Sequence, residues 1–228
     1  MSIDILLIMA SYNKIILFDI DYTLFDTDAY RRILYPKLAG ELGIGEYDLR
    51  IFRREFEPEM KEKFGHFVPS FFLQKIISLA NRPTNIEKLE KIFWDKKMYL
   101  AVLDPKSKEI IEKLQNNNVT IGLFSTGDKE HQLAKIESLL VYLPEENHHI
   151  FSNKIELIGD IIQKYKDFKV YLVDDLPEVL AKAKIRNLEV VTILRKTNKI
   201  YETTNLIEGF RPDYEIDNLS EIEEIVLK

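Results

Sequence analysis

A short apolar run at residues 15–18 ends directly in two carboxylates, Asp19 and Asp21, and constrains the fold more than any other feature. Short apolar runs bounded by polar residues predict strands that are buried on both faces of a parallel sheet. Because Asp19 and Asp21 are two residues apart, an extended backbone points both side chains to the same side. Ligands of open α/β sheets bind at the carboxyl ends of strands, so this stretch predicts a binding site.

A simple turn after the strand is the alternative, since Asp favours turns. That interpretation is weakened because apolar Ile20 separates the two acids and Thr23 and Leu24 follow them.

Further apolar runs alternate with helical patterns along the chain. Strands are predicted at residues 119–124, 169–173 and 190–194, with shorter candidates at 150–151 and 214–216, and helices at 106–115, 129–140, 155–165, 177–186 and 219–227. Alternating strands and helices predict βαβ units. We therefore expect an α/β fold, a doubly wound parallel sheet covered by helices on both faces.

Residues 28–100 interrupt this alternation with helical patterns only, in four apolar stripes. We expect an all-helical insert there and an α/β core formed by residues 10–27 and 101–228. The aromatic residues of the insert are expected to form its own core, although some could line the roof of a cleft. The polar stretch at residues 196–211 predicts a long surface loop.

Charge and composition exclude several classes of function. The net charge of −6 argues against a general binder of nucleic acid or membrane surfaces. The chain has no cysteine, which excludes disulfides, thiolate zinc sites and cysteine nucleophiles. The apolar start at residues 3–9 is too short to span a bilayer and lacks the features of a signal peptide. We expect a cytoplasmic protein.

Polar side chains follow three of the predicted strands where each one ends. They are Asp19 with Asp21, Ser125 with Thr126, and Asp174 with Asp175. The carboxyl ends of parallel strands lie on one edge of a sheet, so these groups are expected to converge. Convergent carboxylates repel unless a cation or proton neutralises them, and oxygen ligands favour Mg²⁺.

Four motifs in this order resemble the signatures of the haloacid dehalogenase-like superfamily, over residues 14–175. The first is the strand followed by Asp-x-Asp-x-Thr at residues 19–23, and the second is the strand that ends at Ser125. The third is Lys154 at the start of a helix, and the fourth is the strand that ends in Asp174 and Asp175. The insert at residues 28–100 resembles the helical cap of this superfamily.

The resemblance implies a role for each of these residues. Asp19 would attack phosphorus and form an aspartyl-phosphate, and Asp21 would protonate the leaving oxygen and then activate water. Lys154 would neutralise Asp19 and phosphate. Ser125, with backbone amides near Thr126 and Gly127 before a helix, would bind the phosphoryl oxygens. Asp19, the backbone carbonyl of Asp21 and Asp175 would hold Mg²⁺ directly, and Asp174 would hold it through water.

Several of these residues also have simpler interpretations. Ser125 could cap a helix, and Lys154 could be solvated while Lys164 or Lys166 takes its place. A metal site at His148 and His149 is less expected than a solvated loop, because no second nitrogen cluster has ligand spacing. The four arginines of the insert could grip a phosphorylated substrate, but a solvated helix face is expected for each of Arg31, Arg32, Arg53 and Arg54.

These observations favour a Mg²⁺-dependent phosphatase, a phosphoric monoester hydrolase that acts on a small phosphorylated metabolite. Within the resemblance, dehalogenases lack an acid at the position of Asp21, so its presence argues against that activity. A phosphomutase would retain both acids and stays an alternative. A non-catalytic phospho-ligand-binding module on the same fold is another, because a fold does not guarantee an activity.

Overall fold

The structure is a computed structural model that describes residues 13–197 and 209–228. A six-stranded sheet forms its centre, with all neighbouring strands parallel. The strands are β1 (Asn13–Phe18), β2 (Val119–Thr126), β3 (His148–Phe151), β4 (Phe168–Asp174), β5 (Val191–Arg195) and β6 (Tyr214–Ile216), in the order β3-β2-β1-β4-β5-β6. The predicted α/β class is confirmed. The strand order reverses between β1 and β4, which is where open sheets of this kind bind ligands.

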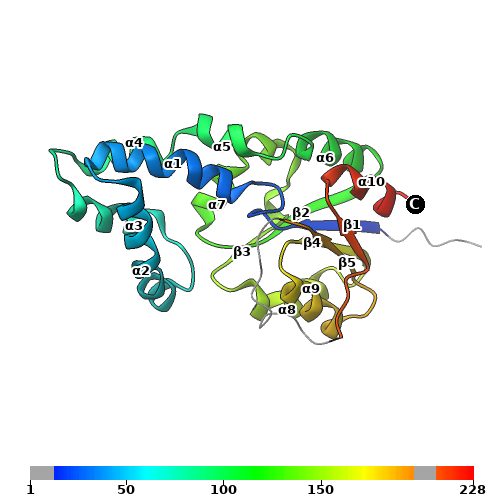
Figure 1. Cartoon of the computed structure of the whole chain (residues 1–228). Coiled ribbons are helices and arrows are strands. Elements are labelled where there is room, and N and C mark those ends of the chain that lie inside the picture. Colours follow the sequence, from blue (N-terminus) through cyan, green and yellow to red (C-terminus); the bar gives the residue numbers. More distant parts are fainter. Residues whose placement is uncertain (1–12, 198–208) are drawn as a thin grey trace, which may run out of the picture.

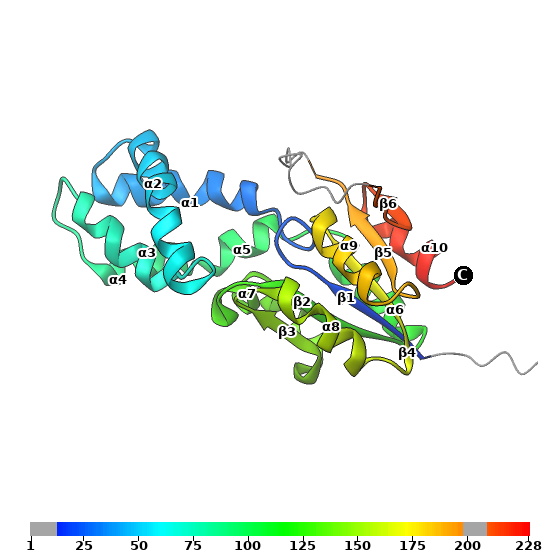
Figure 2. The ribbon, with the colours of Figure 1, turned by 90° about the horizontal axis from the view of Figure 1, so that it is seen from below.

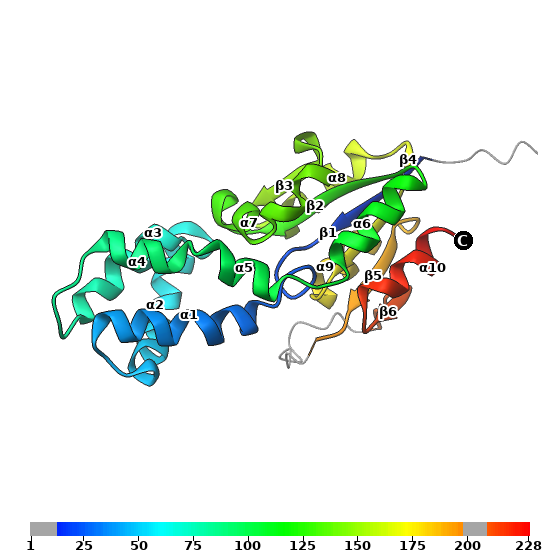
Figure 3. The same ribbon diagram turned by 90° about the horizontal axis from the view of Figure 1, so that it is seen from above.

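Helices cover both faces of the sheet. Figure 2 shows α8 (Lys154–Lys164) and α9 (Pro177–Arg186) on one face, and Figure 3 shows α6 (Ser107–Asn116) and α10 (Ile222–Val226) on the other. Successive side chains of a strand point to opposite faces. Ile16 and Phe18 of β1 therefore pack in the cluster that includes α6 and α10, and Ile15 and Leu17 pack against α8 and α9. This double burial explains why β1 is apolar without interruption.

Five helices between β1 and α6 form a separate layer beyond the carboxyl end of β1 (Figure 1). They are α1 (Thr27–Leu42), α2 (Glu46–Phe64), α3 (Pro69–Ile76), α4 (Ile86–Phe93) and α5 (Lys96–Val102). The carboxylate of Asp26 caps α1 by accepting a hydrogen bond from the amide of Ala29 at 2.8 Å, and α1 ends at Gly43, which has a φ of 72°. Left-handed backbone at a helix end favours glycine.

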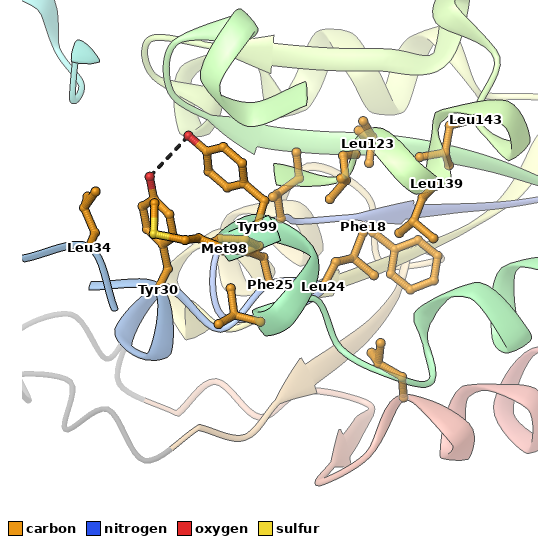
Figure 4. Packing of buried hydrophobic residues seen from close by; sticks show 14 of the residues in the cluster. Phe18, Leu24, Phe25, Tyr30, Leu34, Met98, Tyr99, Leu123, Leu139 and Leu143 are labelled. Atoms are coloured by element: carbon orange, nitrogen blue, oxygen red, sulfur yellow. Dashed lines mark hydrogen bonds between the residues drawn. The ribbon is translucent and has the colours of Figure 1, made fainter. Parts of the chain in front are cut away.

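The two segments that connect these helices to the sheet run side by side. Phe25 and Leu103 form an antiparallel bridge, and the amide of Asp104 donates to the carbonyl of Leu24 at 2.8 Å. One apolar cluster continues from the sheet through this junction into α1, where Tyr30 donates a hydrogen bond to Tyr99 at 3.2 Å (Figure 4). The helical layer and the sheet therefore share a continuous core.

The structure differs from the sequence predictions in three local features. Helix α5 was not predicted; Asp95 caps it, and Met98, Tyr99 and Val102 form its buried side. The helix expected at residues 129–140 ends early, as α7 (Lys129–Lys135) followed by a 3₁₀ helix at Glu137–Tyr142. The solvated loop expected at His148 and His149 is wrong, because both residues belong to β3 and His149 is buried.

Two sequence predictions fall largely outside the described residues. They are the apolar start at residues 3–9 and most of the surface loop at residues 196–211. Among the helices that the structure describes, none is long and apolar enough to cross a membrane.

Candidate active site

Lys154 joins the acids at the ends of β1 and β4. Its Nζ lies 2.6 Å from Oδ1 of Asp19 and 2.5 Å from Oδ2 of Asp174, and all three side chains are buried. Burial alone lowers the pKa of Lys154, but the carboxylates of Asp174 and Asp19 outweigh it, and the pKa rises above its ordinary value. The alternatives Lys164 and Lys166 are exposed. The structure thus places Lys154, from the start of α8, between two strand ends.

Three buried carboxylates form a group that can hold a cation. Oxygen atoms of Asp19, Asp174 and Asp175 all lie within 4.8 Å of one another. Burial raises the pKa of Asp174; Lys154 opposes this rise, and the negative charges of Asp19 and Asp175 add to it. One ammonium does not balance three carboxylates, so the group fits a hard divalent cation such as Mg²⁺ in charge and in ligand type.

Asp21 lies in a different electrostatic environment, although only Ile20 separates it from Asp19. The chain turns immediately after it, because Tyr22 has a left-handed φ of 61°. Lys135 Nζ lies 2.7 and 2.8 Å from the two carboxylate oxygens of Asp21. Burial raises the pKa of Asp21, but the charge and hydrogen bonds of Lys135 outweigh it and hold the pKa well below its usual range. Asp21 is therefore held as a carboxylate.

Sequence analysis missed the three residues that bind Asp21. Besides Lys135, they are Gln132, whose Nε2 donates to Oδ2 at 2.8 Å, and Thr27, whose hydroxyl donates to Oδ1. Gln132 and Lys135 are three residues apart on α7, so they share one helix face. Two polar residues at this spacing, directly after the strand that ends in Ser125 and Thr126, were the sequence signal from which Gln132 and Lys135 could have been identified.

The predicted phosphate-binding residues lie at the end of β2 and directly after it. Ser125 is buried, and its hydroxyl has no hydrogen-bond partner among the described residues, so it caps no helix. The hydroxyl of Thr126 accepts from the backbone amide of Lys154 at 3.3 Å. The amide of Gly127 donates to the carbonyl of Phe151 at 2.8 Å, while Thr126 and Gly127 both line the cavity described below, so phosphate binding by amides near them stays a prediction.

A cavity of about 370 Å³ lies between this edge of the sheet and the helical layer. Its floor includes Asp19, Asp21, Lys154 and Asp175, whereas Ser125 and Asp174 are not among its lining residues. Its roof is mostly aromatic and apolar: Tyr30, Leu34, Tyr35, Phe67, Phe72 and Phe93.

One of the four arginines in the helical layer also reaches this cavity with its side chain buried. Arg53 retains only 8% of its surface and lines the roof, so the solvated face expected for it is wrong.

A comparison with protein families found one match, at residues 16–142, to the haloacid dehalogenase-like hydrolases. No relative was found among proteins with curated functions.

Solved structures of similar fold include proteins with different activities in their names. A protein of Burkholderia xenovorans LB400 named as a haloacid dehalogenase-like hydrolase superposes with a TM-score of 0.75 at 17% identity, covering 94% of this chain and 96% of that one. The 2-haloacid dehalogenase of Pseudomonas syringae pv. tomato gives a TM-score of 0.61 at 17% identity, with 94% and 98% covered. A HAD phosphatase of Thermococcus onnurineus gives 0.55 at 20% identity, with 93% and 97% covered.

Proposed function

The chain belongs to the haloacid dehalogenase-like hydrolases, and we propose that within this family it is a Mg²⁺-dependent phosphatase of small phosphomonoesters. Asp21 carries the proposal. The leaving group of a phosphate ester is an alkoxide, which needs a proton, whereas the leaving group of a haloacid is a halide, which does not. Asp21 is a second carboxylate that lines the cavity with Asp19 and accepts a hydrogen bond from Lys135. It would supply the proton transfer that ester hydrolysis requires and dehalogenation does not.

The acids at the strand ends support the metal requirement. Asp19, Asp175 and the backbone carbonyl of Asp21 would hold Mg²⁺, and Asp174 would hold it through water. When bound, the cation would offset the repulsion between Asp19 and the phosphoryl oxygens. Lys154 supplies a second positive charge at the same place, and it also fixes Asp19 through Oδ1. The buried Ser125 hydroxyl, which has no hydrogen-bond partner among the described residues, would be a further donor for a phosphoryl oxygen.

The proposed reaction has two displacements at phosphorus. A carboxylate oxygen of Asp19 forms a bond to phosphorus while the bond to the leaving oxygen breaks. The leaving oxygen takes a proton from the hydrogen-bonded pair of Asp21 and Lys135, and Asp21 passes it on. Water then forms a bond to phosphorus while the bond between the Asp19 oxygen and phosphorus breaks, which releases phosphate and restores the Asp19 carboxylate, and one proton of the water returns to the pair of Asp21 and Lys135. Each turnover thus restores the pair to its starting charge.

The helical layer is proposed to act as a cap over this site. We assign residues 28–100 to this cap and residues 10–27 and 101–228 to the core. The loop after α2 reaches the core, because a Cβ at Gly65 would lie 3.5 Å from Ser152, two residues before Lys154. A cap in this position excludes water from the phosphorylated intermediate except at the attacking position.

Hydrolysis of p-nitrophenyl phosphate and of 2-chloropropionate tests the proposal against the dehalogenase activity of related folds. We expect phosphate release with Mg²⁺, loss of that activity with EDTA, recovery with excess Mg²⁺ and no chloride release. The control is Asp19→Asn, which removes the nucleophile and should be inactive. Chloride release that EDTA does not affect, without phosphate release, would contradict the proposal.

A further inference from the structure

We propose that the roof of the cavity contains a second anion-binding subsite, centred on Arg53, which selects phosphomonoesters that carry another oxyanion at their far end. This inference rests on the phosphatase function proposed above and names the class of its substrate. The substrate would have a phosphate at one end, an apolar spacer, and a carboxylate or second phosphate at the other.

Arg53 is a buried cation with unused hydrogen-bonding capacity. Its guanidinium lies 4.9 Å from the centre of the Phe67 ring, and its Nη1 is buried without a hydrogen-bond partner among the described residues. Oε2 of Glu57 lies 2.8 Å from this nitrogen, at ion-pair distance but without the direction of a hydrogen bond. A buried donor without a partner is costly, so such groups usually indicate a missing ligand or water.

The other cations that line the cavity already have partners within the protein. Lys154 binds Asp19 and Asp174, Lys135 binds Asp21, and Arg31 donates to Tyr22 and Asp28. Glu57, the partner of Arg53, differs from these acids because its side chain is 60% exposed and therefore hydrated. An incoming oxyanion would compete with water-exposed Glu57 for Arg53 rather than with a buried carboxylate.

His66 supplies a second, independent observation at the same place. Its Nδ1 is buried without a hydrogen-bond partner among the described residues, and His66 lines the cavity together with Arg53. A guanidinium and an imidazole can together donate several hydrogen bonds to a carboxylate or phosphate.

The space between the two ends of the cavity determines the rest of the substrate. Five apolar or aromatic side chains line the cavity, Tyr30, Leu34, Phe67, Phe72 and Phe93, and the ring of His131 packs among them. They suit a hydrocarbon or ring and offer little to a polyhydroxylated spacer. The volume of about 370 Å³ is near the lower end of small-molecule sites, which favours a metabolite over a phosphoprotein.

A series of paired substrates tests this subsite with the full-length enzyme and Mg²⁺. The phosphate esters of ω-hydroxy acids with three to eight carbons are each compared with the matching carboxamide. Alkanediol bisphosphates compared with the monophosphates form a second arm and distinguish phosphate from carboxylate. We expect kcat/KM to favour the anionic member by at least about tenfold at one spacer length, because a hydrogen bond between charged groups has about that effect.

Three variants assign this preference to Arg53. Arg53→Met should reduce the ratio of kcat/KM values to about one, and Glu57→Gln should increase it, because the competing carboxylate is gone. Misfolding lowers the activity toward both members of a substrate pair, so it cannot lower the ratio in one variant and raise it in the other. The matched control is Arg54→Met, which changes the adjacent arginine that the structure exposes and should leave the ratio unchanged.

Binding measurements separate failure of this inference from failure of the phosphatase proposal. If wild-type enzyme hydrolyses the esters with a ratio of one at every length, or Arg53→Met keeps the preference, the subsite is overturned. If no phosphomonoester is hydrolysed, the phosphatase proposal fails instead. Calorimetry with the matching phosphonates then still measures the subsite: a preference for carboxylate over carboxamide that Arg53→Met removes supports it, and equal affinities overturn it.

Discussion

Asp19 and Asp21 are nearly adjacent in sequence, yet different lysines hold them. Lys154 binds Asp19 from α8, and Lys135 binds Asp21 from α7. Both acids follow the end of β1 at Phe18 and line the same cavity, and Tyr22 directly after them has a left-handed φ of 61°. Two acids with separate cations can have separate functions in one reaction, which is the basis of the proposed mechanism.

Replacing each of these acids by its amide should separate the two displacements. Asp19→Asn removes the nucleophile, so no phospho-enzyme should form. Asp21→Asn retains the nucleophile but removes the proton transfer, which typically contributes about 10²–10⁴-fold to the rate. Among substrates, p-nitrophenyl phosphate should phosphorylate the Asp21→Asn variant with the smallest loss of rate, because p-nitrophenolate leaves readily without a proton. Hydrolysis of the intermediate should be slow, so phospho-enzyme should accumulate.

Rapid-quench kinetics measures this difference directly. We expect a burst of phospho-enzyme in Asp21→Asn and none in Asp19→Asn. A burst in Asp19→Asn would show that another group attacks phosphorus.

Among the helices, α7 contributes more to the site than its length suggests. It spans only Lys129–Lys135, yet it supplies Gln132 and Lys135 to Asp21. The chain enters α7 through Gly127, whose φ of 149° is a conformation that side chains with a Cβ rarely adopt. A residue with a Cβ at this position would strain the connection from β2 to α7.

Replacing Gly127 by Ala should lower activity through α7. The added Cβ would lie 2.6 Å from Nε2 of Gln132, which must then move from Asp21. We expect kcat to fall by up to about 10²-fold, a typical effect of misplacing a catalytic group by about 1 Å. Steady-state kinetics with p-nitrophenyl phosphate measures it.

The matched control for this prediction is Gly40→Ala within α1. A Cβ there meets nothing within 4 Å, so the substitution should raise the free energy of unfolding by about 0.5–1 kcal/mol in urea denaturation and leave kcat unchanged. Normal kcat in Gly127→Ala would show that Gln132 is not needed at Asp21.

At the scale of the whole molecule, the stability of the sheet should depend on pH through an edge strand. His149 of β3 is buried, and its Nε2 lies 2.7 Å from the hydroxyl of Tyr165, which donates to Asn147. Burial, together with the charges of Lys164 and His148 acting in the same direction, lowers the pKa of His149 to about 4. The folded protein therefore holds this imidazole neutral under conditions in which the unfolded chain protonates it.

Acidification should therefore destabilise the wild type through His149. The unfolded imidazole binds a proton near pH 6.5 and the folded one only near pH 4, so its contribution is complete above about pH 6.5 and is lost as the pH falls toward 4. We expect a loss of about 1–2 kcal/mol from this residue, after allowance for partial hydration of the ring.

The difference in thermal stability between wild type and His149→Gln, measured from pH 7.5 to 4.5, isolates this contribution. Gln retains a hydrogen-bond donor but does not titrate, so the variant should lose less stability on acidification. Parallel curves for the two proteins would exclude His149 as the source.

The sequence by itself determined the α/β class and the residues at the strand ends. Buried strands of a parallel sheet must be apolar throughout, and their carboxyl ends must meet at one edge. Asp19, Asp174 and Asp175 could therefore be assigned to one place before their distances were known. Lys154 was identifiable because it is the first residue of the helix that precedes β4, and the order of helices and strands can be predicted from the sequence.

Only the tertiary structure decided which partners these acids have and which surface charges are buried. Lys135 lies 114 residues beyond Asp21, and their contact depends on how α7 packs at the end of the sheet. Arg53 and Arg54 have the same side chain in adjacent positions, yet the cavity roof buries the first and solvent surrounds the second. A residue's type and spacing define a helix face, but the element that packs against that face determines its burial, its charge partners and its pKa.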